Sequence, residues 1–208
     1  MKQHNFPIGK IKNCQICNSE DLIEVINLGD QPLANTLVKN IEDDDTIEKY
    51  PVNIIRCNEC TLLQIDYIVD QTKVYHLDYP YLPGITKTVD NEQLDLSDYL
   101  FKELDLKNDQ LVVDIGSNDG SLLKHFKSKS LKTVGVEPTN ISKIANQNGI
   151  KTIQSFFNEE ISKTIIKDFG KAKLITCTNV FAHMSTLGDV MDGIVNLLDE
   201  DGYFCFEN

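Results

Sequence analysis

The sequence predicts an α/β fold in which a parallel sheet of about five strands follows a small β-rich domain. After residue 89, short apolar runs of strand length alternate with amphipathic segments, as is typical of a parallel sheet with right-handed helical crossovers. A glycine turn directly follows the first of these runs, and four cysteines lie in two pairs before residue 70. We therefore expect a metal-binding domain at 11–70, a connector containing tyrosine and proline at 71–88, and an α/β domain at 89–208.

The α/β domain is expected to begin with a helix from about Asp90 to Leu104, after which strands and amphipathic helices alternate. Ile161, Ile165 and Phe169 recur at helical spacing, and a later stripe ends where Asp199–Gly202 predicts the turn that closes its helix. That later stripe contains Leu187, Val190, Met191, Ile194 and Leu198. The expected strands lie at 111–115, 132–136, 173–177 and 203–207, with a weaker one near 150–153.

Composition excludes several classes of function. The chain has a formal charge of −12, and Arg56 is the only arginine among its 20 basic residues. Because phosphate recognition needs clustered lysine and arginine, we expect no nucleic-acid partner. The start of the chain lacks an apolar signal core, and no stretch approaches the ~20 apolar residues of a membrane span. We therefore expect no membrane association, and a reducing cytoplasm is the default compartment.

Two Cys-x-x-Cys pairs predict a zinc site whose ligands are Cys14, Cys17, Cys57 and Cys60. Two residues between thiolates let both sulfurs face one ion, and two such turns supply the four-sulfur set that zinc prefers. The interval between the pairs is longer than in a usual zinc ribbon, so another small element must fill it. Four unrelated buried cysteines and a redox pair are the alternatives. Because four sulfur ligands leave no position for a reactive water, the site is expected to be structural.

The turn after the first predicted strand is the most informative motif of the α/β domain. The chain reads Leu-Val-Val-Asp-Ile-Gly-Ser-Asn-Asp-Gly-Ser-Leu-Leu over 111–123, which is a strand, a glycine turn and a helix start. This geometry brings backbone amides close to a nucleoside-bearing ligand. Gly116 and Gly120 have the spacing Gly-x-x-x-Gly, which differs from the Gly-x-Gly-x-x-Gly motif of dinucleotide-binding proteins. Glu137 ends the next apolar run, where its carboxylate can accept hydrogen bonds from both ribose hydroxyls. The combination favours S-adenosylmethionine (SAM) over NAD.

Residues from four strand ends are expected to share one pocket, because ligands of open α/β sheets bind beyond the carboxyl ends of the strands. Phe156 and Phe157 follow the weak strand, in position to cover a base, although Phe156 fits the core equally well. Asn118 is a cofactor candidate that also fits the role of a turn former. The other candidates for cofactor contacts are Asp114, Gly116, Ser117, Gly120, Glu137, Thr178 and Asn179.

His183 follows the fourth strand in Asn-Val-Phe-Ala-His-Met and is a candidate acid or base. A structural role is the alternative, because a lone histidine is often structural. His125 lies among lysines on a predicted helix and is expected to be solvated. Cys177 and Cys205 lie in predicted strands and fit small buried hydrophobic residues.

The order of these motifs resembles that of the SAM-dependent sugar C-methyltransferases, which act on nucleotide-linked keto-deoxysugars. The resemblance covers nearly all of the chain and includes the paired cysteines and the segment Asn-Leu-Gly-Asp-Gln-Pro-Leu-Ala-Asn at 27–35. The segments at 113–123, Gly-Val-Glu-Pro at 135–138 and Asn-Val-Phe-Ala-His at 179–183 match the family's cofactor and active-site signatures. The resemblance implies a Rossmann-like class I methyltransferase sheet after a zinc-binding domain, with SAM and Zn²⁺ as cofactors and a nucleotide sugar as substrate.

The same resemblance implies roles for residues of the connector. In the family the zinc domain caps the cleft and tyrosines line the sugar site, so Tyr79 and Tyr81 would contact substrate and His183 would lie near the reacting centre. Packing between the domains is the alternative for the tyrosines. Methylating a carbon requires removal of a proton next to a ketone, and Tyr and His are suitable donors and bases. The family continues with Ser-rich sequence where this chain has Leu-Pro-Gly-Ile at 82–85, which leaves the sugar open.

A second departure from the family lies at the end of the chain, Phe206-Glu207-Asn208. The family continues with further strands and a C-terminal domain, and its catalytic histidine would follow Asn208. We therefore expect the N-terminal portion of a sugar C-methyltransferase, or a chain that works with a complementing C-terminal polypeptide. A pseudoenzyme or subunit that binds SAM and zinc without turnover is the second hypothesis. A zinc-containing nucleic-acid-binding module is a third, which the negative charge opposes.

Overall fold

The chain forms two units, and each is described by itself. The first comprises Met1–Val74 and the short segment Ser185–Asp189, and the second comprises Tyr75–Met184 and Val190–Asn208. The structure is a computed structural model that describes residues 6–34, 47–77, 82, 84 and 86–207. No helix in this described part of the chain combines the length and apolar character that crossing a membrane requires.

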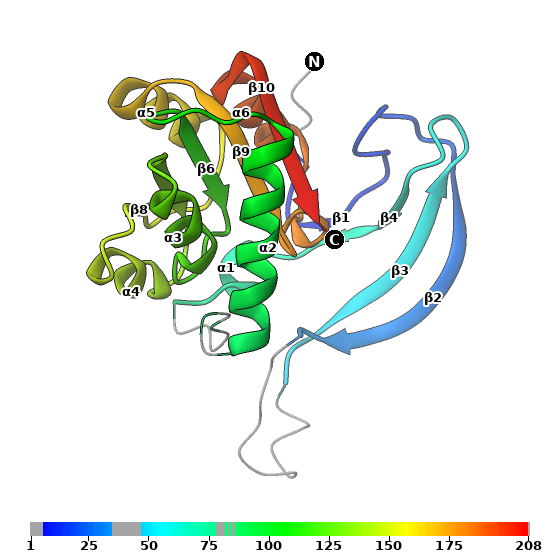
Figure 1. The fold of residues 1–208 in the computed structure, drawn as a ribbon. Coiled ribbons are helices and arrows are strands. Elements are labelled where there is room, and N and C mark those ends of the chain that lie inside the picture. The colour runs from blue at the N-terminus through cyan, green and yellow to red at the C-terminus, as the bar shows by residue number, and fades with distance from the viewer. Residues whose placement is uncertain (1–5, 35–46, 78–81, 83, 85, 208) are drawn as a thin grey trace. The chain divides into compact units, whose positions relative to one another are not determined.

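The second unit is built on a five-stranded parallel sheet (Figure 1). Its strands are β6 (Leu111–Ile115), β7 (Lys132–Val136), β8 (Thr152–Ile153), β9 (Ala172–Thr178) and β10 (Leu198–Glu207). Their order across the sheet is β10-β9-β6-β7-β8, and each neighbouring pair is parallel. The direction of winding therefore reverses beside β6. At such a switch point the adjacent loops part and leave a crevice at the carboxyl ends of the strands.

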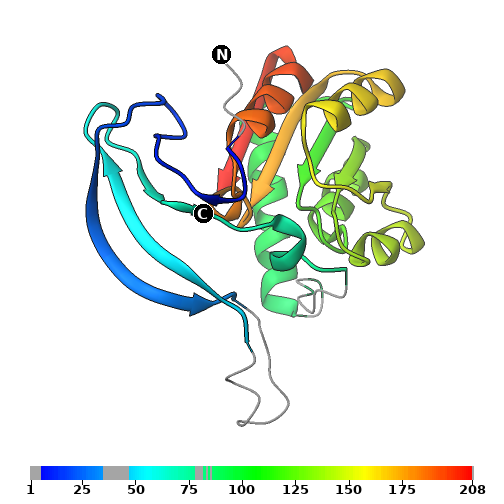
Figure 2. The same ribbon diagram turned by 180° about the vertical axis from the view of Figure 1, so that it is seen from behind.

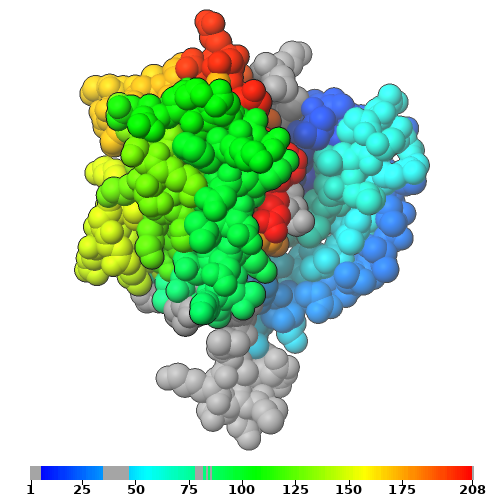
Figure 3. All heavy atoms as spheres, in the orientation of Figure 1, coloured from blue at the N-terminus to red at the C-terminus, as the bar shows by residue number. Residues whose placement is uncertain are grey.

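Helices cover both faces of this sheet (Figures 1 and 2). One face carries α2 (Lys87–Glu103), α3 (Ser121–Ser128) and α4 (Ile141–Gln147), and the other carries α5 (Glu159–Phe169) and α6 (Gly188–Leu197). Val112 of β6 belongs to the core under α2 and α3, and its neighbour Val113 belongs to the core under α5 and α6. This division follows from the pleat, which points successive side chains to opposite faces. In the space-filling view, α2 forms much of the surface of this unit that is turned toward the viewer (Figure 3).

Helix α5 shows how local sequence sets the ends of an element. The side chain of Asn158 accepts a hydrogen bond from the backbone N–H of Ile161 at 2.9 Å, which caps the first turn. Gly170 ends the helix with a φ of 92°. Ile165 is fully buried, and Ile161 and Phe169 pack beside it against the same core. The predicted helical stripe is therefore confirmed.

The predicted strands and α2 lie close to their expected positions, and one predicted turn differs. The sequence predicts a turn at Asp199–Gly202, whereas these residues belong to β10 in the structure. Leu198 pairs with Ala172, and the next aligned pair is Tyr203 with Leu174. The intervening residues therefore bulge out of register with β9, and a bulge lets the chain change direction without leaving the sheet.

The first unit is made of strands and cysteine turns. Strands β2 (Leu22–Pro32), β3 (Lys49–Cys57) and β4 (Leu63–Ile65) form an antiparallel sheet in that order, β1 (Gly9–Lys10) pairs with β5 (Tyr67–Ile68), and the short helix α1 spans Gln71–Val74. The element expected between the cysteine pairs is thus a long pair of antiparallel strands, coloured blue and cyan in Figure 1.

Candidate functional site

The loop that follows β6 turns tightly in a left-handed conformation. Its φ angles are 74° at Gly116, 49° at Asn118 and 78° at Gly120. Glycine and asparagine adopt this region most readily. The backbone N–H groups of Gly116 and Ser117 donate to the carbonyl oxygen of Val136 at 2.8 and 3.1 Å. The loop is therefore held against the end of β7, and α3 begins directly after it.

Space as well as backbone conformation requires glycine in this loop. A Cβ on Gly116 would lie 2.4 Å from Cγ2 of Val180, which follows β9. Gly116 and Val180, near the starts of the loops after β6 and β9, are thus in close contact. A Cβ on Gly135 of β7 would lie 2.3 Å from Oγ of Ser117. The Ser117 hydroxyl is buried against β7 and has no hydrogen-bond partner within the described part of the chain.

Glu137 lies at the end of β7 beside the same loop. It is 6% exposed, and its two carboxylate oxygens accept hydrogen bonds from the backbone N–H of Asn118 at 3.1 Å and of Thr139 at 2.9 Å. Each oxygen has a second lone pair and can still accept a hydroxyl proton. The carboxylate predicted to bind ribose is therefore held between two backbone amides next to the glycine loop.

Asp114 is buried in β6 and bonded across the sheet. The hydroxyl of Thr176 in β9 donates to its Oδ1 at 2.7 Å. Burial raises the pKa of Asp114 to about 7, the Thr176 hydrogen bond opposes this rise, and the carboxylate of Glu137 adds to it. Thr176 is a contact that sequence reasoning missed, because only the strand order places β9 next to β6.

The raised pKa of Asp114 predicts that the protein loses stability as the pH rises from about 4 to about 7. The folded chain holds this proton with a pKa of about 7 and the unfolded chain with one of 3.8. The contribution of the carboxyl group is therefore complete below the unfolded pKa and is lost as the pH rises through the folded pKa. Asp114→Asn stays neutral and should flatten the dependence of the thermal midpoint on pH.

The matched control for this measurement is Asp201→Asn. Its ion pair with Lys173 lowers the pKa of exposed Asp201, so its charge is constant over the tested range. In Asp201→Asn, the slope of the thermal midpoint against pH should equal that of the unaltered protein. An Asp114→Asn protein with the same slope as the control would contradict the prediction.

The end of β9 brings further predicted residues to this edge of the sheet. Asn179 is exposed, has a φ of 55°, and donates its backbone N–H to the carbonyl oxygen of Glu207 in β10 at 2.8 Å. A short 3₁₀ helix, η3, spans Phe181–His183. The backbone N–H of His183 donates to Val180 at 3.0 Å, and its side chain is exposed. His183 is thus accessible at the carboxyl end of a central strand.

Phe157 lies in the hydrophobic core. It is 7% exposed, and its ring lies so close to Gly193 of α6 that a Cβ there would be 2.9 Å from the ring. Phe156 is half-buried and more accessible. This placement fits packing for Phe157 and leaves Phe156 as the better placed of the two to cover a base.

The predicted substrate contacts Tyr79 and Tyr81 lie outside the described residues, so their roles stay predictions. The described end of the connector reaches the glycine loop, because the backbone N–H of Gly84 donates to Oδ2 of Asp119 at 3.1 Å. The other oxygen of Asp119 accepts the backbone N–H of Ser121 at 3.2 Å. The sequence analysis did not single out Asp119 as a residue that holds the connector. The only sign of this role in the sequence is that an acidic residue lies inside the glycine turn.

The expectation that His125 is solvated is wrong. This residue is 9% exposed, and its Nε2 lies 3.0 Å from Oδ1 of Asp90 in α2. Because α3 packs against α2, His125 turns inward while Lys124 and Lys127 on the same helix stay exposed. The lysines gave a misleading signal about the face on which this histidine lies.

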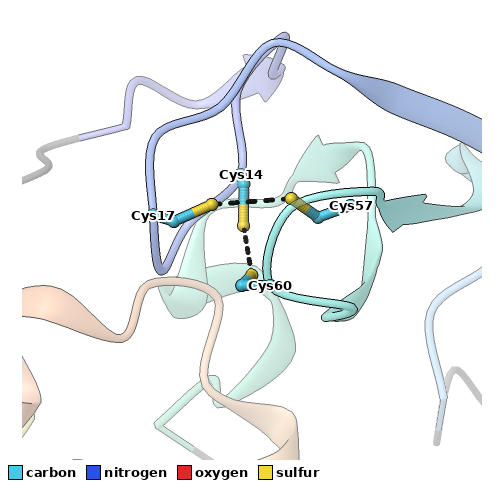
Figure 4. A group of neighbouring side chains, drawn as sticks. All are labelled: Cys14, Cys17, Cys57 and Cys60. Carbon is cyan, nitrogen blue, oxygen red and sulfur yellow. Dashed lines mark hydrogen bonds between the residues drawn. The ribbon is translucent and has the colours of Figure 1, made fainter.

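Four cysteine sulfurs point toward one another in the first unit (Figure 4). The Sγ atoms of Cys14, Cys17, Cys57 and Cys60 all lie within 4.8 Å of one another, with Cys14 and Cys60 at 3.4 Å and Cys17 and Cys57 at 3.5 Å. Sulfurs bound to one zinc ion at ~2.3 Å lie about 3.8 Å apart, so this set fits zinc. The backbone N–H of Cys60 lowers the pKa of the Cys57 thiol to about 7, whereas burial and hydrogen bonds among the thiols raise the pKa values of Cys17 and Cys60. The four-sulfur donor set is that of a structural zinc site.

Two protein-family models match the chain. Residues 14–75 match a model described as "Putative zinc binding domain", and residues 87–208 match one described as "Methyltransferase domain". The first range contains the four clustered cysteines, and the second contains the parallel sheet with its glycine loop.

Similar proteins include the C-methyltransferase NovU of Streptomyces niveus, which is 28% identical over 198 residues, or 95% of this chain and 47% of the relative. The chain thus spans about half the length of that curated relative. A solved S-adenosylmethionine-dependent methyltransferase from Clostridium acetobutylicum is 21% identical, with 65% of this chain and 53% of that one covered and a TM-score of 0.44. The plantazolicin methyltransferase BamL, solved with a triazolic desmethylPZN analogue and SAH, is 17% identical, with 55% and 44% covered and a TM-score of 0.44.

Proposed function

Since this chain belongs to the methyltransferase domain family, we propose that it transfers a methyl group from SAM to a carbon atom of a nucleotide-linked keto-deoxysugar. The family resemblance drawn from the motifs is confirmed, because the matched ranges and the C-methyltransferase relative agree with it. The sugar substrate and the chemical steps rest on the resemblance and on the residues at the site. Thiolate ligands persist best in a reducing compartment, which supports the cytoplasm as the place of action.

The observation that carries the proposal is the position of Glu137 beside the glycine loop. The carboxylate is fixed by the amides of Asn118 and Thr139, next to the close approach of Gly116 and Val180. A left-handed glycine loop at the end of one strand and a fixed acceptor for two hydroxyls at the end of the next together suit the ribose of SAM. This pair comes from neighbouring strands at the switch point, where α/β sheets bind their ligands.

The chemistry assigns separate tasks to the residues of this chain. Bound SAM supplies a methyl group that its sulfonium charge makes reactive toward a carbon nucleophile. A ring nitrogen of His183 takes the proton from the carbon next to the substrate ketone, and the electron pair stays on the substrate as an enolate. The hydroxyls of Tyr79 and Tyr81 donate hydrogen bonds to the enolate oxygen. Bound SAM would supply the methyl group to this carbon, with the electron pair of the broken methyl–sulfur bond staying on its sulfur, and the residues that hold both partners would set the alignment on which the rate depends.

Isothermal titration of the zinc-loaded chain with SAM tests the cofactor claim. We expect measurable binding and, in Glu137→Ala, an affinity at least about tenfold lower, because a hydrogen bond to a charged group contributes roughly 1.5–3 kcal/mol. Glu160→Ala, an exposed position on α5, is the matched control and should bind like the unaltered chain. Equal affinities in Glu137→Ala and the control would remove the support for this ribose site, and no binding by the unaltered chain would refute the proposal.

In a second form of the proposal, the chain binds SAM and zinc as one subunit and depends on a complementing polypeptide for turnover. The match to NovU covers 47% of that relative, so the activity in its name is not assigned to the matched residues alone. Methyl transfer to a keto-sugar nucleotide by the zinc-loaded chain alone separates the two. Transfer that His183→Gln abolishes supports the first form, and SAM binding without transfer supports the second.

A further inference from the structure

The carboxylate of Glu137 is held by two backbone amides, each of which belongs to a different loop. The N–H of Asn118 donates to its Oε2 at 3.1 Å, and the N–H of Thr139 donates to its Oε1 at 2.9 Å. Asp119 directly follows the first of these residues, and Asn140 directly follows the second. Any group that is bound by Asp119 or Asn140 is therefore held one residue away from a contact of Glu137.

The connector is attached at both of these positions. Oδ2 of Asp119 accepts the backbone N–H of Gly84 at 3.1 Å, and the backbone N–H of Asn140 donates to the carbonyl oxygen of Leu77 at 2.9 Å. All of these residues belong to the second unit. The two loops that fix the carboxylate of Glu137 thus also fix two points of the connector.

The attachment at Asp119 depends on a side chain, whereas the one at Asn140 is made by the backbone alone. Oδ1 of Asp119 accepts the backbone N–H of Ser121 at 3.2 Å, and the backbone N–H of Asp119 donates to Oδ1 of Asn118 at 2.9 Å. Because both carboxylate oxygens accept a hydrogen bond, the side chain cannot turn without losing one. A Cβ on Gly84 would lie 2.4 Å from Oδ2 of Asp119, so only glycine allows so close an approach.

We propose that Asp119 is a positioning residue that couples the connector to Glu137, so that a ribose bound at Glu137 also fixes the connector at Gly84. One hydrogen bond joins Gly84 to Asp119, and a second joins Glu137 to the neighbouring residue, Asn118. Coupling is reciprocal, so a change at either end should be felt at the other. The coupling between Glu137 and Gly84 needs no ligand, whereas its importance for SAM rests on the proposed function.

Amide exchange of the full zinc-loaded chain, measured by NMR without ligand, tests the coupling. In Asp119→Ala the Gly84 amide loses its acceptor, so we expect it to exchange about tenfold faster. The decisive variant is Glu137→Ala, which leaves the hydrogen bond from Gly84 to Asp119 in place. There the Gly84 amide should exchange about threefold faster than in the unaltered chain, because the loop that carries Asp119 is held less firmly. An unchanged Gly84 amide in Glu137→Ala would overturn the inference.

Two further proteins control this measurement. Asp168→Ala, at an exposed position on α5, should leave the Gly84 amide unchanged. In the double variant Asp119→Ala and Glu137→Ala, the Gly84 amide should exchange as in Asp119→Ala alone, since its link to Glu137 is already broken. The amides of β6 should be unchanged in every variant, which excludes a general loosening of the unit.

Gly84→Ala tests the same attachment from the side of the connector. The new methyl group displaces Oδ2 of Asp119 but leaves the start of α3, where Ser121 donates to Oδ1, with its acceptor. The Asn118 amide, which donates to Glu137, should therefore exchange about threefold faster in Gly84→Ala. In the Asp119→Ala background the methyl group meets no carboxylate, and Gly84→Ala should change nothing further. This variant keeps the test decisive if Asp119→Ala disturbs α3.

Calorimetry with S-adenosylhomocysteine (SAH) as the probe tests the importance of the coupling for the cofactor. Asp119→Ala and Gly84→Ala should each bind SAH about fivefold more weakly than the unaltered chain, because part of the binding free energy is then spent on ordering the loop. Weaker binding in Asp119→Ala with unaltered binding in Gly84→Ala would indicate a direct contact of Asp119 with the ligand and would count against a positioning role. Absence of SAH binding by the unaltered chain would refute the proposed function instead, and the exchange experiment without ligand would still decide the coupling.

Discussion

Loss of one cysteine ligand, as in Cys57→Ser, is expected to unfold the first unit while the sheet of the second unit stays folded. The apolar side chains that are buried among the described residues of the first unit are Ile11, Cys14, Ile55, Cys57 and Ile68. So small a core supplies little stabilisation, and small domains of this kind commonly depend on a metal. Structural zinc contributes about 10–16 kcal/mol of apparent binding free energy in zinc-finger peptides at neutral pH.

The second unit has no such dependence, because two separate hydrophobic cores lie on the faces of its sheet. Hydrogen exchange should therefore lose protection along β3 and keep it along β6, and metal analysis should find much less than one zinc per chain. Cys205→Ser is the control, since Cys205 is half-buried in β10 and is not a member of the cluster. Full protection of β3 in a zinc-free Cys57→Ser protein would show that metal does not hold this unit together.

Gly116→Ala is expected to destabilise the second unit by roughly 2–5 kcal/mol, as the sum of left-handed strain and overpacking. The φ of 74° opposes any side chain, and the new Cβ would lie 2.4 Å from Val180. Relief of this contact moves the loop after β6 away from the loop after β9. Because the same loop carries the amide that holds Glu137, SAM affinity should fall about a hundredfold or more, which calorimetry measures.

Two variants separate strain from contact in this prediction. Gly149→Ala has a similar φ of 78°, but the nearest atom to its Cβ would be the flexible Lys127 Nζ at 3.8 Å, so it reports strain alone. Val180→Ala in the Gly116→Ala background relieves the contact and should recover part of the loss. Equal destabilisation by Gly116→Ala and Gly149→Ala would mean that the two loops do not meet as closely as described.

Local patterns predicted the second unit well, because its elements carry their signals within a few residues. The run of buried residues in β6 is followed at once by the glycine turn at Gly116. The helical stripe of α5 likewise ends at a recognisable residue, Gly170. Contacts between side chains of different elements have no local pattern in the sequence from which they could be predicted. The bond from Thr176 to Asp114 depends on strand order, and the pair of His125 with Asp90 depends on which helix packs beside α3.

The long strands of the first unit escaped prediction for a different reason. Nearly all of β2 is exposed, including Ile23, Val25 and Leu28. A period of two in hydrophobicity appears only when one face of a strand is buried. The register of β2 with β3 also shifts at two places, which interrupts any alternation that remains. The cysteine spacing was the one strong signal here, because metal ligation restricts residue type more tightly than packing does.

The discontinuity of the first unit has a consequence for its synthesis. Ser185 accepts hydrogen bonds from the side chains of Gln71 and Gln15, and it follows these residues by 114 and 170 positions. Ribosomes add about 5–20 residues per second, so the cysteine turns are made several seconds before Ser185, to which the side chain of Gln15 donates a hydrogen bond. The nascent chain can therefore load its metal early, but it completes the first unit only after β9 has been made. Translation thus sets the order of synthesis: the cysteine turns come first, the strands β6 to β9 follow, and Ser185 comes after them.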